Sequence, residues 1–390
     1  MAFNWLRGAR EAPRERKSSG YAPALAVHGA GRATWSARDG ASLARNGFSR
    51  NVIGFRCVRM LAEAAAATPL AADDGERRLV RHPVLSLLGR PNGGQGRAEF
   101  LEALYGHLLL SGDAWVEGAG RLSTGAPAEL HALRPDRMRV IPGADGWPEA
   151  YEYGVGGKRR RWDLTEGEIC PILHVRAFHP LDDHYGLSPL AAAMASVDVH
   201  NSAGAWAKAL LDNAARPSGA LIYRGPDGAA LSQSQYDRLK DELESGHQGA
   251  VNAGRPMLLE GGLDWKPMGF SPSDMEFLQT RTAAARDVAI AFGVPPMLLG
   301  LPGDATYANY QEANRAFHRQ TVLPLVGKVA DALSRWLEDW TGEAVRLAPD
   351  LDGVPALAPE REALWRTVSR AEFLSDAEKR RMLGLPEEPA

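Results

Sequence analysis

The sequence predicts an α+β protein in which long helices accompany short antiparallel strands. Apolar residues recur with helical spacing over 188–214 and again over 309–340. Between residues 113 and 175 the pattern changes to short runs rich in β-branched and aromatic residues, separated by glycine, proline and aspartate. A chain of 390 residues with 45% apolar residues can hold two or three domains and bury a sizeable core.

Composition argues against several classes of protein. The apolar runs fall well short of the roughly 18 residues that cross a bilayer, and the start of the chain lacks the apolar segment of a signal peptide. We therefore expect synthesis in the cytoplasm and no membrane segment. Cys57 and Cys170 are the only cysteines and have no metal-binding spacing, so we expect neither disulfides nor zinc, with Cys57 in the core.

The net charge of −3 conceals an uneven distribution. Residues 1–59 carry eleven basic residues against three acidic ones, whereas residues 331–390 carry eight against thirteen. Residues 1–45 have little periodicity, and we expect a basic, partly disordered arm there. Charge alone leaves open whether this arm is a solvated tail or meets nucleic acid or an acidic partner subunit.

Residues 46–187 are expected to form the first α+β region. Helical patterns cover 49–66, 82–89 and 97–110, with Ser49 opening the first helix and Thr68-Pro69 closing it. Strands and hairpins are expected at the runs AWVEG, MRVIP, EAYEYGV and ILHVRAF.

A second helical region is expected to begin at Ser188. Ser188 suits the N-cap and Pro189 the first helical position, which predicts an alanine-rich helix over 188–214. Residues 215–270 then form a small α/β insertion, with a helix from Ser232 to Ser245 opened by an S-x-x-Q box. Its expected strands are GALIYR, PMLLE and LDWKPM.

A capped helix is predicted over 271–293. Ser271 suits the N-cap, and Asp274 can return a hydrogen bond as its capping-box partner. Gly293 tolerates positive φ, and Pro295 and Pro296 cannot continue the helix, so it should end near Phe292.

An exposed loop at 294–308 and a much longer helix at 309–342 follow. Pro324 lies inside the long helix, where it removes one hydrogen bond and clashes with the preceding turn. We therefore predict a kink at Pro324 and no termination. Residues 343–390 add a short helical stretch and a polar tail.

The order of several sequence phrases resembles the portal proteins, or head-tail connectors, of long-tailed bacteriophages and phage-derived gene transfer agents. These phrases run through about four fifths of the chain and are specific in combination. They are NVIGFRCVRMLAEAAAATPL at 51–70, HPVLSLLGRPN at 82–92, EFLEALYGHLLLSGDAWVE at 99–117, YGLSPL at 185–190, NAGRPMLLEGGLDWKPM at 252–268 and FGVPPMLLG at 292–300.

The resemblance implies a portal fold. In that fold, 46–187 is an α/β wing, 188–214 and 271–293 are the two stem helices, and 215–270 is the clip. Residues 294–308 then contain the tunnel loop, 309–342 the kinked wing helix, and 343–390 a small helical crown and tail.

The resemblance also implies a function. The chain is expected to be one subunit of a homo-oligomeric ring, of about twelve copies, at one vertex of a capsid assembled in the cytoplasm of a bacterial host. The ring would form a channel for packaging and ejection of double-stranded DNA. The implied partners are the major capsid protein, the terminase large subunit and a head-tail adaptor, with no cofactor and no enzymatic activity.

The tunnel-loop residues named by this resemblance are Gly303, Asp304, Ala305, Thr306 and Tyr307. The loop GLPGDATYA contains no Lys or Arg. Cationic residues would add salt-dependent affinity for DNA phosphates and slow the movement of DNA, so their absence suits a channel. The alternative interpretation is an ordinary solvent-exposed loop.

The densest group of potential catalytic residues is HVRAFHPLDDHYG, which contains His174, His179, Asp182, Asp183 and His184. Imidazole and carboxylate groups can bind divalent metals, which keeps a metal-dependent hydrolase as an alternative. The spacing fits no two-histidine helical face, and the neighbouring proline and glycine indicate a turn. We therefore favour a polar turn without metal. A scaffold or adaptor without a channel is the other alternative.

A basic run, Lys158, Arg159, Arg160 and Arg161, follows Gly156-Gly157. This pattern is typical of a hairpin tip. The four cations could contact phosphates or an acidic patch of a capsid protein, although most such tips are simply solvated.

Overall fold

The computed structural model describes residues 34–73, 78–79, 82–165, 168–212, 219–223, 232–247, 263–267, 277–303 and 306–385. Residues 1–35 and 36–390 separate into two units, and the helices and strands of the described ranges belong to the second. The predicted disorder of residues 1–33, the Ser271–Asp274 capping box, the PMLLE strand, and the loop residues Asp304 and Ala305 lie outside the described residues.

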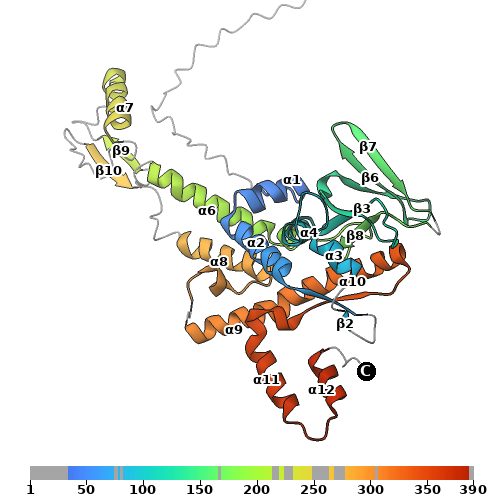
Figure 1. Cartoon of the computed structure of the whole chain (residues 1–390). Coiled ribbons are helices and arrows are strands. Elements are labelled where there is room, and N and C mark those ends of the chain that lie inside the picture. Colours follow the sequence, from blue (N-terminus) through green and yellow to red (C-terminus); the bar gives the residue numbers. More distant parts are fainter. Residues whose placement is uncertain are drawn as a thin grey trace, which may run out of the picture. The chain divides into compact units, whose positions relative to one another are not determined.

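Helices carry most of the core (Figure 1). The longer ones that build it are α2 (Val52–Ala67), α4 (Arg97–Ser111), α6 (Met194–Asp212), α8 (Phe277–Ala291), α9 (Tyr307–Phe317) and α10 (Leu323–Thr341). Helix α2 packs on α4, and α6 packs on α8. The shorter or peripheral helices are α1 (Gly40–Ser42), α3 (Pro83–Gly89), α5 (Pro189–Ala192), α7 (Gln233–His247), α11 (Ala358–Ser369) and α12 (Asp376–Leu383).

The strands form small antiparallel sheets. One sheet has the order β4-β3-β8, from Glu129–Leu133, Asp113–Ala119 and Ile172–Arg176. A second has the order β5-β6-β7, from Met138–Pro142, Pro148–Val155 and Lys158–Asp163. A third joins β11 (Arg346–Pro349), β1 (Leu70–Asp73) and β2 (Arg78–Leu79). These sheets and helices confirm the α+β class.

A second, smaller core lies between the first two sheets and is centred on Trp115. Its indole is fully buried and packs edge-on against Tyr151, with ring centroids 5.0 Å apart. Burial of an aromatic ring of this size supplies a large apolar contact area. The other buried members are Leu133, Met138, Val140, Trp162 and Ile172.

The start of α2 differs from the prediction that Ser49 opens this helix. Asn51 is the N-cap, and its side-chain Oδ1 accepts the N–H groups of Ile53 and Gly54 at 3.1 and 2.9 Å. Ser49 instead ends a π-helical segment, Leu43–Ser49, and its hydroxyl donates to the Ala44 carbonyl. Serine and asparagine are both favoured N-cap residues. The Ser49 hydroxyl already bonds within the preceding π-helical segment, and Asn51 caps α2 instead.

Residues 36–45 of the predicted N-terminal arm make hydrogen bonds and core contacts with later helices. The backbone N–H and the hydroxyl of Ser36 both donate to the Asp198 carboxylate on α6, each at 2.7 Å. Leu43 is buried in the main core. Residues 36–45 therefore belong structurally with the helical core that comes after them in the chain.

The start of the second helical region confirms the prediction for Ser188. The hydroxyl of Ser188 accepts the N–H of Ala191 at 2.9 Å, and Pro189 occupies the first turn. The helix is interrupted by a turn at Ala193, so α5 and α6 replace the single predicted helix. Its alanine-rich early part, including Ala191 and Val197, is buried against neighbouring helices.

The insertion keeps the predicted elements where it is described. Strands β9 (Gly219–Tyr223) and β10 (Leu263–Pro267) pair antiparallel. The S-x-x-Q box opens α7: Ser232 N donates to Gln235 Oε1 at 3.0 Å, and Gln235 N donates to Ser232 Oγ at 3.3 Å.

The C-terminal region contains a strand that periodicity did not predict. β11 pairs with β1 in a register that places Leu70 opposite Pro349 and Asp73 opposite Arg346. Residues just after the long helix therefore join a sheet that begins with residue 70. The two helices α11 and α12 come after this strand, in agreement with a helical C-terminal region.

Candidate functional site

The first half of the loop between α8 and α9 is anchored to the long helix. Gly293 has a φ of 64°, which ends α8 as predicted. The Thr321 hydroxyl donates to the Gly293 carbonyl at 2.8 Å, and a Cβ at Gly293 would lie 2.9 Å from that hydroxyl oxygen. Leu298, in the short 3₁₀ turn that comes next, is buried. The hydrogen bond to Thr321 and the burial of Leu298 therefore fix the conformation of the chain directly after α8.

The second half of the loop is held at both of its ends. The Arg286 guanidinium on α8 donates to the Pro302 carbonyl. Thr306 is the N-cap of α9, and its hydroxyl accepts the Asn309 N–H at 3.2 Å. The described members of the predicted tunnel loop, Gly303, Thr306 and Tyr307, are all exposed, with Tyr307 at 79%.

Three arginines on the helices that flank this loop are engaged by groups of the chain itself. Arg286 is bonded to the Pro302 carbonyl. Arg315 on α9 pairs with Glu312 at 3.1 Å, and Arg319 lies 3.6 Å from Glu360 on α11. These three guanidinium groups therefore already have partners within the chain.

The long helix behind the loop contains a π-helical turn, His318–Val322, immediately before Pro324. Proline removes one backbone donor and displaces the preceding turn, and a wider π turn accommodates such a displacement. The helix then continues as α10 to Thr341, so the prediction that Pro324 does not end it is confirmed. The kink itself stays a prediction.

A buried polar junction connects the start of α2 with α6 and α8. Asn51 donates to Asn201 at 3.0 Å and lies 3.2 Å from Nδ1 of His200. Arg281 of α8 donates to the other ring nitrogen of His200 at 3.4 Å. Elsewhere on the same pair of helices, Ser196 donates to Asp287 at 3.1 Å. These bonds fix the relative rotation of α6 and α8.

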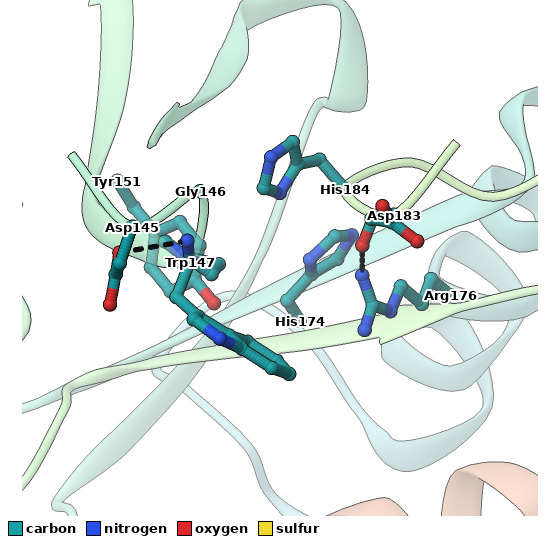
Figure 2. Close-up of a pocket in the computed structure, with 9 residues that line it drawn as sticks. Asp145, Gly146, Trp147, Tyr151, His174, Arg176, Asp183 and His184 are labelled. Atoms are coloured by element: carbon teal, nitrogen blue, oxygen red, sulfur yellow. Dashed lines mark hydrogen bonds between the residues drawn. The ribbon is translucent and has the colours of Figure 1, made fainter. Parts of the chain in front are cut away.

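In the His/Asp turn, which is the alternative metal site, most polar groups form hydrogen bonds with the turn's own backbone. Asp182 accepts the N–H groups of His184 and Tyr185 at 2.8 and 3.0 Å. The ring of His179 accepts the Leu181 N–H at 3.1 Å, while Arg176 donates to the Asp183 carbonyl (Figure 2). No three His, Cys, Asp or Glu side chains of the described ranges are placed to hold a metal ion.

His174 makes its ring contact and its hydrogen bond with residues outside this turn. It stacks on Trp115 with ring centroids 3.5 Å apart, and its Nε2 lies 2.8 Å from the Asp113 carboxylate. Asp113 also accepts the Gly186 N–H at 2.9 Å, so this pair ties β3 and β8 to the segment before α5. The geometry gives His174 a structural role.

His174 should make stability depend on pH. Burial lowers the pKa of His174, and the hydrogen bond to Asp113 only partly opposes this effect. The unfolded chain therefore binds the proton more readily, so the contribution to stability is complete above about pH 6.5 and is lost as the pH falls below it. Urea unfolding at pH 7.5 and 5.5 should show that His174→Gln loses less free energy of unfolding at the lower pH than wild type does. If the variant and wild type lose the same free energy of unfolding between pH 7.5 and 5.5, the prediction is wrong. His131→Gln is the control, because His131 is half-exposed.

The basic run forms the start of β7, directly after the Gly156–Gly157 turn, as predicted. Three of its members have carboxylate partners: Arg159 with Glu152 at 3.4 Å, Arg160 with Glu117 at 2.6 Å, and Arg161 with Glu149 at 2.8 Å. Arg160 also covers the Trp162 ring. The hairpin is therefore less positive than the sequence suggests.

Sequence reasoning missed the residues that anchor the loop. Thr306 is the N-cap of α9, and its only sequence signal is that threonine is a favoured N-cap residue. Arg286 and Thr321 gave no signal, because their partners are backbone carbonyls distant in sequence.

No helix in the described ranges is both long enough and apolar enough to cross a membrane.

Comparison with known proteins places these features in a family. The phage portal protein family matches residues 53–384. A chain in the neck of an empty GTA particle, computed with C6 symmetry, is 61% identical, with a TM-score of 0.71 over 92% of this chain and 97% of that one. A chain in the neck of a native GTA particle, computed with C12 symmetry, is 60% identical, with a TM-score of 0.70 over 92% of this chain and 97% of that one. The probable portal protein of Streptomyces phage phiC31 is 28% identical over 80% of this chain and 69% of its own length.

These matches agree with the prediction of a structural virion protein and not an enzyme. The family match extends from the first turn of α2 to the end of α12, and includes α6, α8, the loop between α8 and α9, and the helix through Pro324. The chain belongs to the phage portal protein family.

Proposed function

We propose that this protein is the portal subunit of a gene transfer agent or a related phage particle, located at one vertex of the capsid. The observation that carries the proposal is the 61% identity to a chain of a GTA particle neck over 92% of the sequence. The relatives' sixfold and twelvefold symmetry supports a closed ring, and we favour twelve copies. Such a ring arises when one face of each subunit contacts a different face of the next.

The ring would act as a channel for double-stranded DNA. The proposed channel wall consists of α6, α8 and the loop that ends at Thr306. The loop is anchored at both ends and its neighbouring arginines are paired, which suits contact with a moving polyanion of any sequence. We expect weak, salt-sensitive binding of DNA.

The mechanism is structural. The ring holds the DNA path open during packaging, while the terminase large subunit docks on it and hydrolyses ATP. A head-tail adaptor later takes the place of the terminase, and the major capsid protein surrounds the wing. The described residues offer no metal cluster to the alternative hydrolase.

Negative-stain electron microscopy of the purified chain tests this function. We expect rings with a central hole wide enough for a DNA duplex. Concentration should be varied, because an isolated subunit can need a nucleus to assemble. Compact monomers or open filaments under all conditions would reject the portal and favour a scaffold or adaptor without a channel.

The basic hairpin provides a separate test. Changing Lys158, Arg159, Arg160 and Arg161 together to Ala should lower portal incorporation into particles several-fold if the hairpin docks on an acidic capsid surface. Changing the carboxylate partners Glu149 and Glu152 to Gln is the matched control, because it breaks two of the same ion pairs and keeps the cations. Wild-type incorporation and particle titre for the alanine variant would show that the cations make no contact that assembly requires.

A further inference from the structure

One histidine is buried in the junction between α2, α6 and α8. His200 of α6 is 6% exposed, and Asn51, the N-cap of α2, is 1% exposed. Both ring nitrogens of His200 lie against donor groups. The side-chain nitrogen of Asn51 lies 3.2 Å from Nδ1, and the Nε of Arg281 lies 3.4 Å from Nε2. A neutral imidazole has one N–H and one acceptor nitrogen, so it accepts only one of these two donors at a time.

The surrounding hydrogen bonds decide which donor the ring accepts. The Oδ1 atom of Asn51 accepts two backbone N–H groups of the first turn of α2, so its amide nitrogen faces His200 and Asn201. The amide nitrogen of Asn201 donates in turn to the Asn46 carbonyl at 3.0 Å, which leaves its oxygen for Asn51. Backbone groups at both ends of this chain of bonds fix the orientation of the two amides. Nδ1 of His200 is therefore the acceptor, and Nε2 carries the proton.

The contact with Arg281 is consequently the weaker of the two. A full bond from Arg281 needs the ring proton on Nδ1, where it would oppose Asn51, and the distance of 3.4 Å is long for an N–H donor. Protonation of His200 removes the remaining acceptor, so that neither neighbour keeps a bond to the ring. It also places a second positive charge beside the guanidinium in a buried position. The junction is complete only while the ring is neutral.

Arg281 is the charged group that faces His200 among the described residues of the elements packed on α6, which are α8, α5 and the π-helical segment before α2. The carboxylates of Asp198 on α6 and Asp287 on α8 accept hydrogen bonds from serines, and neither acts on the ring. The other described cations on or next to these elements are all exposed: Arg45, Arg50, Lys208 and Arg286. A protonated His200 therefore has no carboxylate partner in the described part of the chain.

The direction of the pH dependence follows from this environment. Burial lowers the pKa of His200, and the charge of Arg281 lowers it further. An unperturbed histidine has a pKa of about 6.5, so the unfolded chain binds the proton more readily than the folded one. The contribution of the junction to stability is complete above about pH 6.5 and is lost as the pH falls below it.

We propose that His200 is a pH-sensitive joint between α6 and α8: the neutral ring joins Asn51 and Arg281, and the protonated ring releases both. The release is local, because the later part of α8 keeps the bond from Ser196 to Asp287 and the buried contacts of Val288. Acid should therefore loosen the start of α8 and the first turn of α2. The inference concerns bonds inside one chain and does not depend on the proposed ring.

Amide hydrogen exchange of the full chain tests the joint, at pH 7.5, 6.5, 5.5 and 4.5 and with exchange times corrected for the intrinsic rate. The comparison is with His200→Asn, which places a carbonyl oxygen near the position of Nδ1 and does not titrate. Between pH 7.5 and 4.5, the protection of residues 277–285 and 53–56 should fall roughly fivefold more in wild type than in the variant. Both proteins contain His174, so its own acid effect cancels.

Ser196→Ala is the matched control for a weakened α6–α8 contact. It removes one hydrogen bond between the same helices and no titrating ring. We expect lower protection at every pH and the same pH dependence as wild type. Equal pH dependence in wild type and His200→Asn would reject the proposal.

A histidine titration tests the role of Arg281 without reference to helix opening. The Cε1–H signal of His200 is followed by nuclear magnetic resonance in the full chain with labelled histidine, and is assigned by its loss in His200→Asn or His200→Gln. The midpoint should lie below 6.5 in wild type and rise by about half a pH unit in Arg281→Met, which removes the neighbouring charge. A wild-type midpoint at or above 6.5, or an unchanged midpoint in Arg281→Met, would overturn the assignment.

Discussion

Replacing Gly112 with alanine is expected to destabilise the chain strongly, although it adds a single methyl group. Gly112 ends α4 with a φ of 85°, a conformation that alanine adopts at a cost. A Cβ at this position would also lie 2.3 Å from the Gly186 carbonyl oxygen and 2.4 Å from its carbon. Both contacts are with backbone, so no side chain can rotate away.

The close approach at Gly112 connects two parts of the α+β region formed by residues 46–187. The Gly112 carbonyl accepts the Ala177 N–H at 2.7 Å, and a Cβ on Gly186 would in turn lie 2.0 Å from the Gly112 oxygen. A methyl group must therefore separate α4 and β3 from the segment that leads to α5. We expect a loss of about 3–5 kcal/mol in the free energy of unfolding, out of a total of about 5–15 kcal/mol for a typical domain.

Urea unfolding followed by far-ultraviolet circular dichroism measures this loss, with sedimentation confirming that both proteins have the same association state. Gly106→Ala is the matched control. Gly106 lies inside α4 and a Cβ there meets no atom within 4 Å, so alanine should stabilise the helix by about 0.5–1 kcal/mol. Equal unfolding midpoints for Gly112→Ala and wild type would show that the two segments can separate freely.

Local chemistry predicted the ends of helices and the β6–β7 hairpin. The hydroxyl of Ser188 and the positive φ of Gly293 act within a few residues, so their sequence signals are direct. The Gly156–Gly157 turn likewise fixed the β6–β7 hairpin. At the start of α2 two adequate caps stood close together, and the choice of Asn51 depended on bonds to Asn201 and His200 on another helix.

Long-range pairing could not be predicted from periodicity. Strand β11 is short, and it pairs with β1 across most of the length of the chain. Nothing in the four residues Arg346–Pro349 specifies that partner. The paired arginines of β7 illustrate the same limit, because Glu117, the partner of Arg160, lies on β3 in a different sheet. The sequence showed four cations, whereas their local field depends on carboxylates brought near by the fold.

For the candidate site, the sequence predicted where the loop lies and left open how it is held. The stop at Gly293 and the continuing helix after Thr306 located the loop between α8 and α9. The restraints from Arg286 and Thr321 depend on the packing of α8 beside the π-helical turn, which no periodicity reveals. This distinction matters for function, since these bonds fix the points at which the chain enters and leaves the loop at the proposed channel wall.

The second large effect is expected from adding positive charge to that loop. Gly303→Lys together with Ala308→Lys places two exposed ammonium groups on each subunit, which gives about twenty-four in a ring of about twelve. If the loop faces DNA, each new phosphate contact should steepen the salt dependence of DNA binding by about 0.9 in log–log slope. Tighter binding opposes movement of the DNA, so we expect at least a tenfold decrease in nuclease-protected DNA per particle.

The matched variant Gly303→Gln with Ala308→Gln separates charge from shape. It adds side chains of similar length without charge, and it should package nearly as much DNA as wild type. Failure of both variants, with intact rings, would indicate that loop shape controls DNA passage and that charge does not. Wild-type packaging and an unchanged salt slope for the lysine variant would show that residues 303–308 do not meet DNA. Because the cations beside the loop already have partners within the chain, the added lysines would be its first uncommitted positive charges among the residues described.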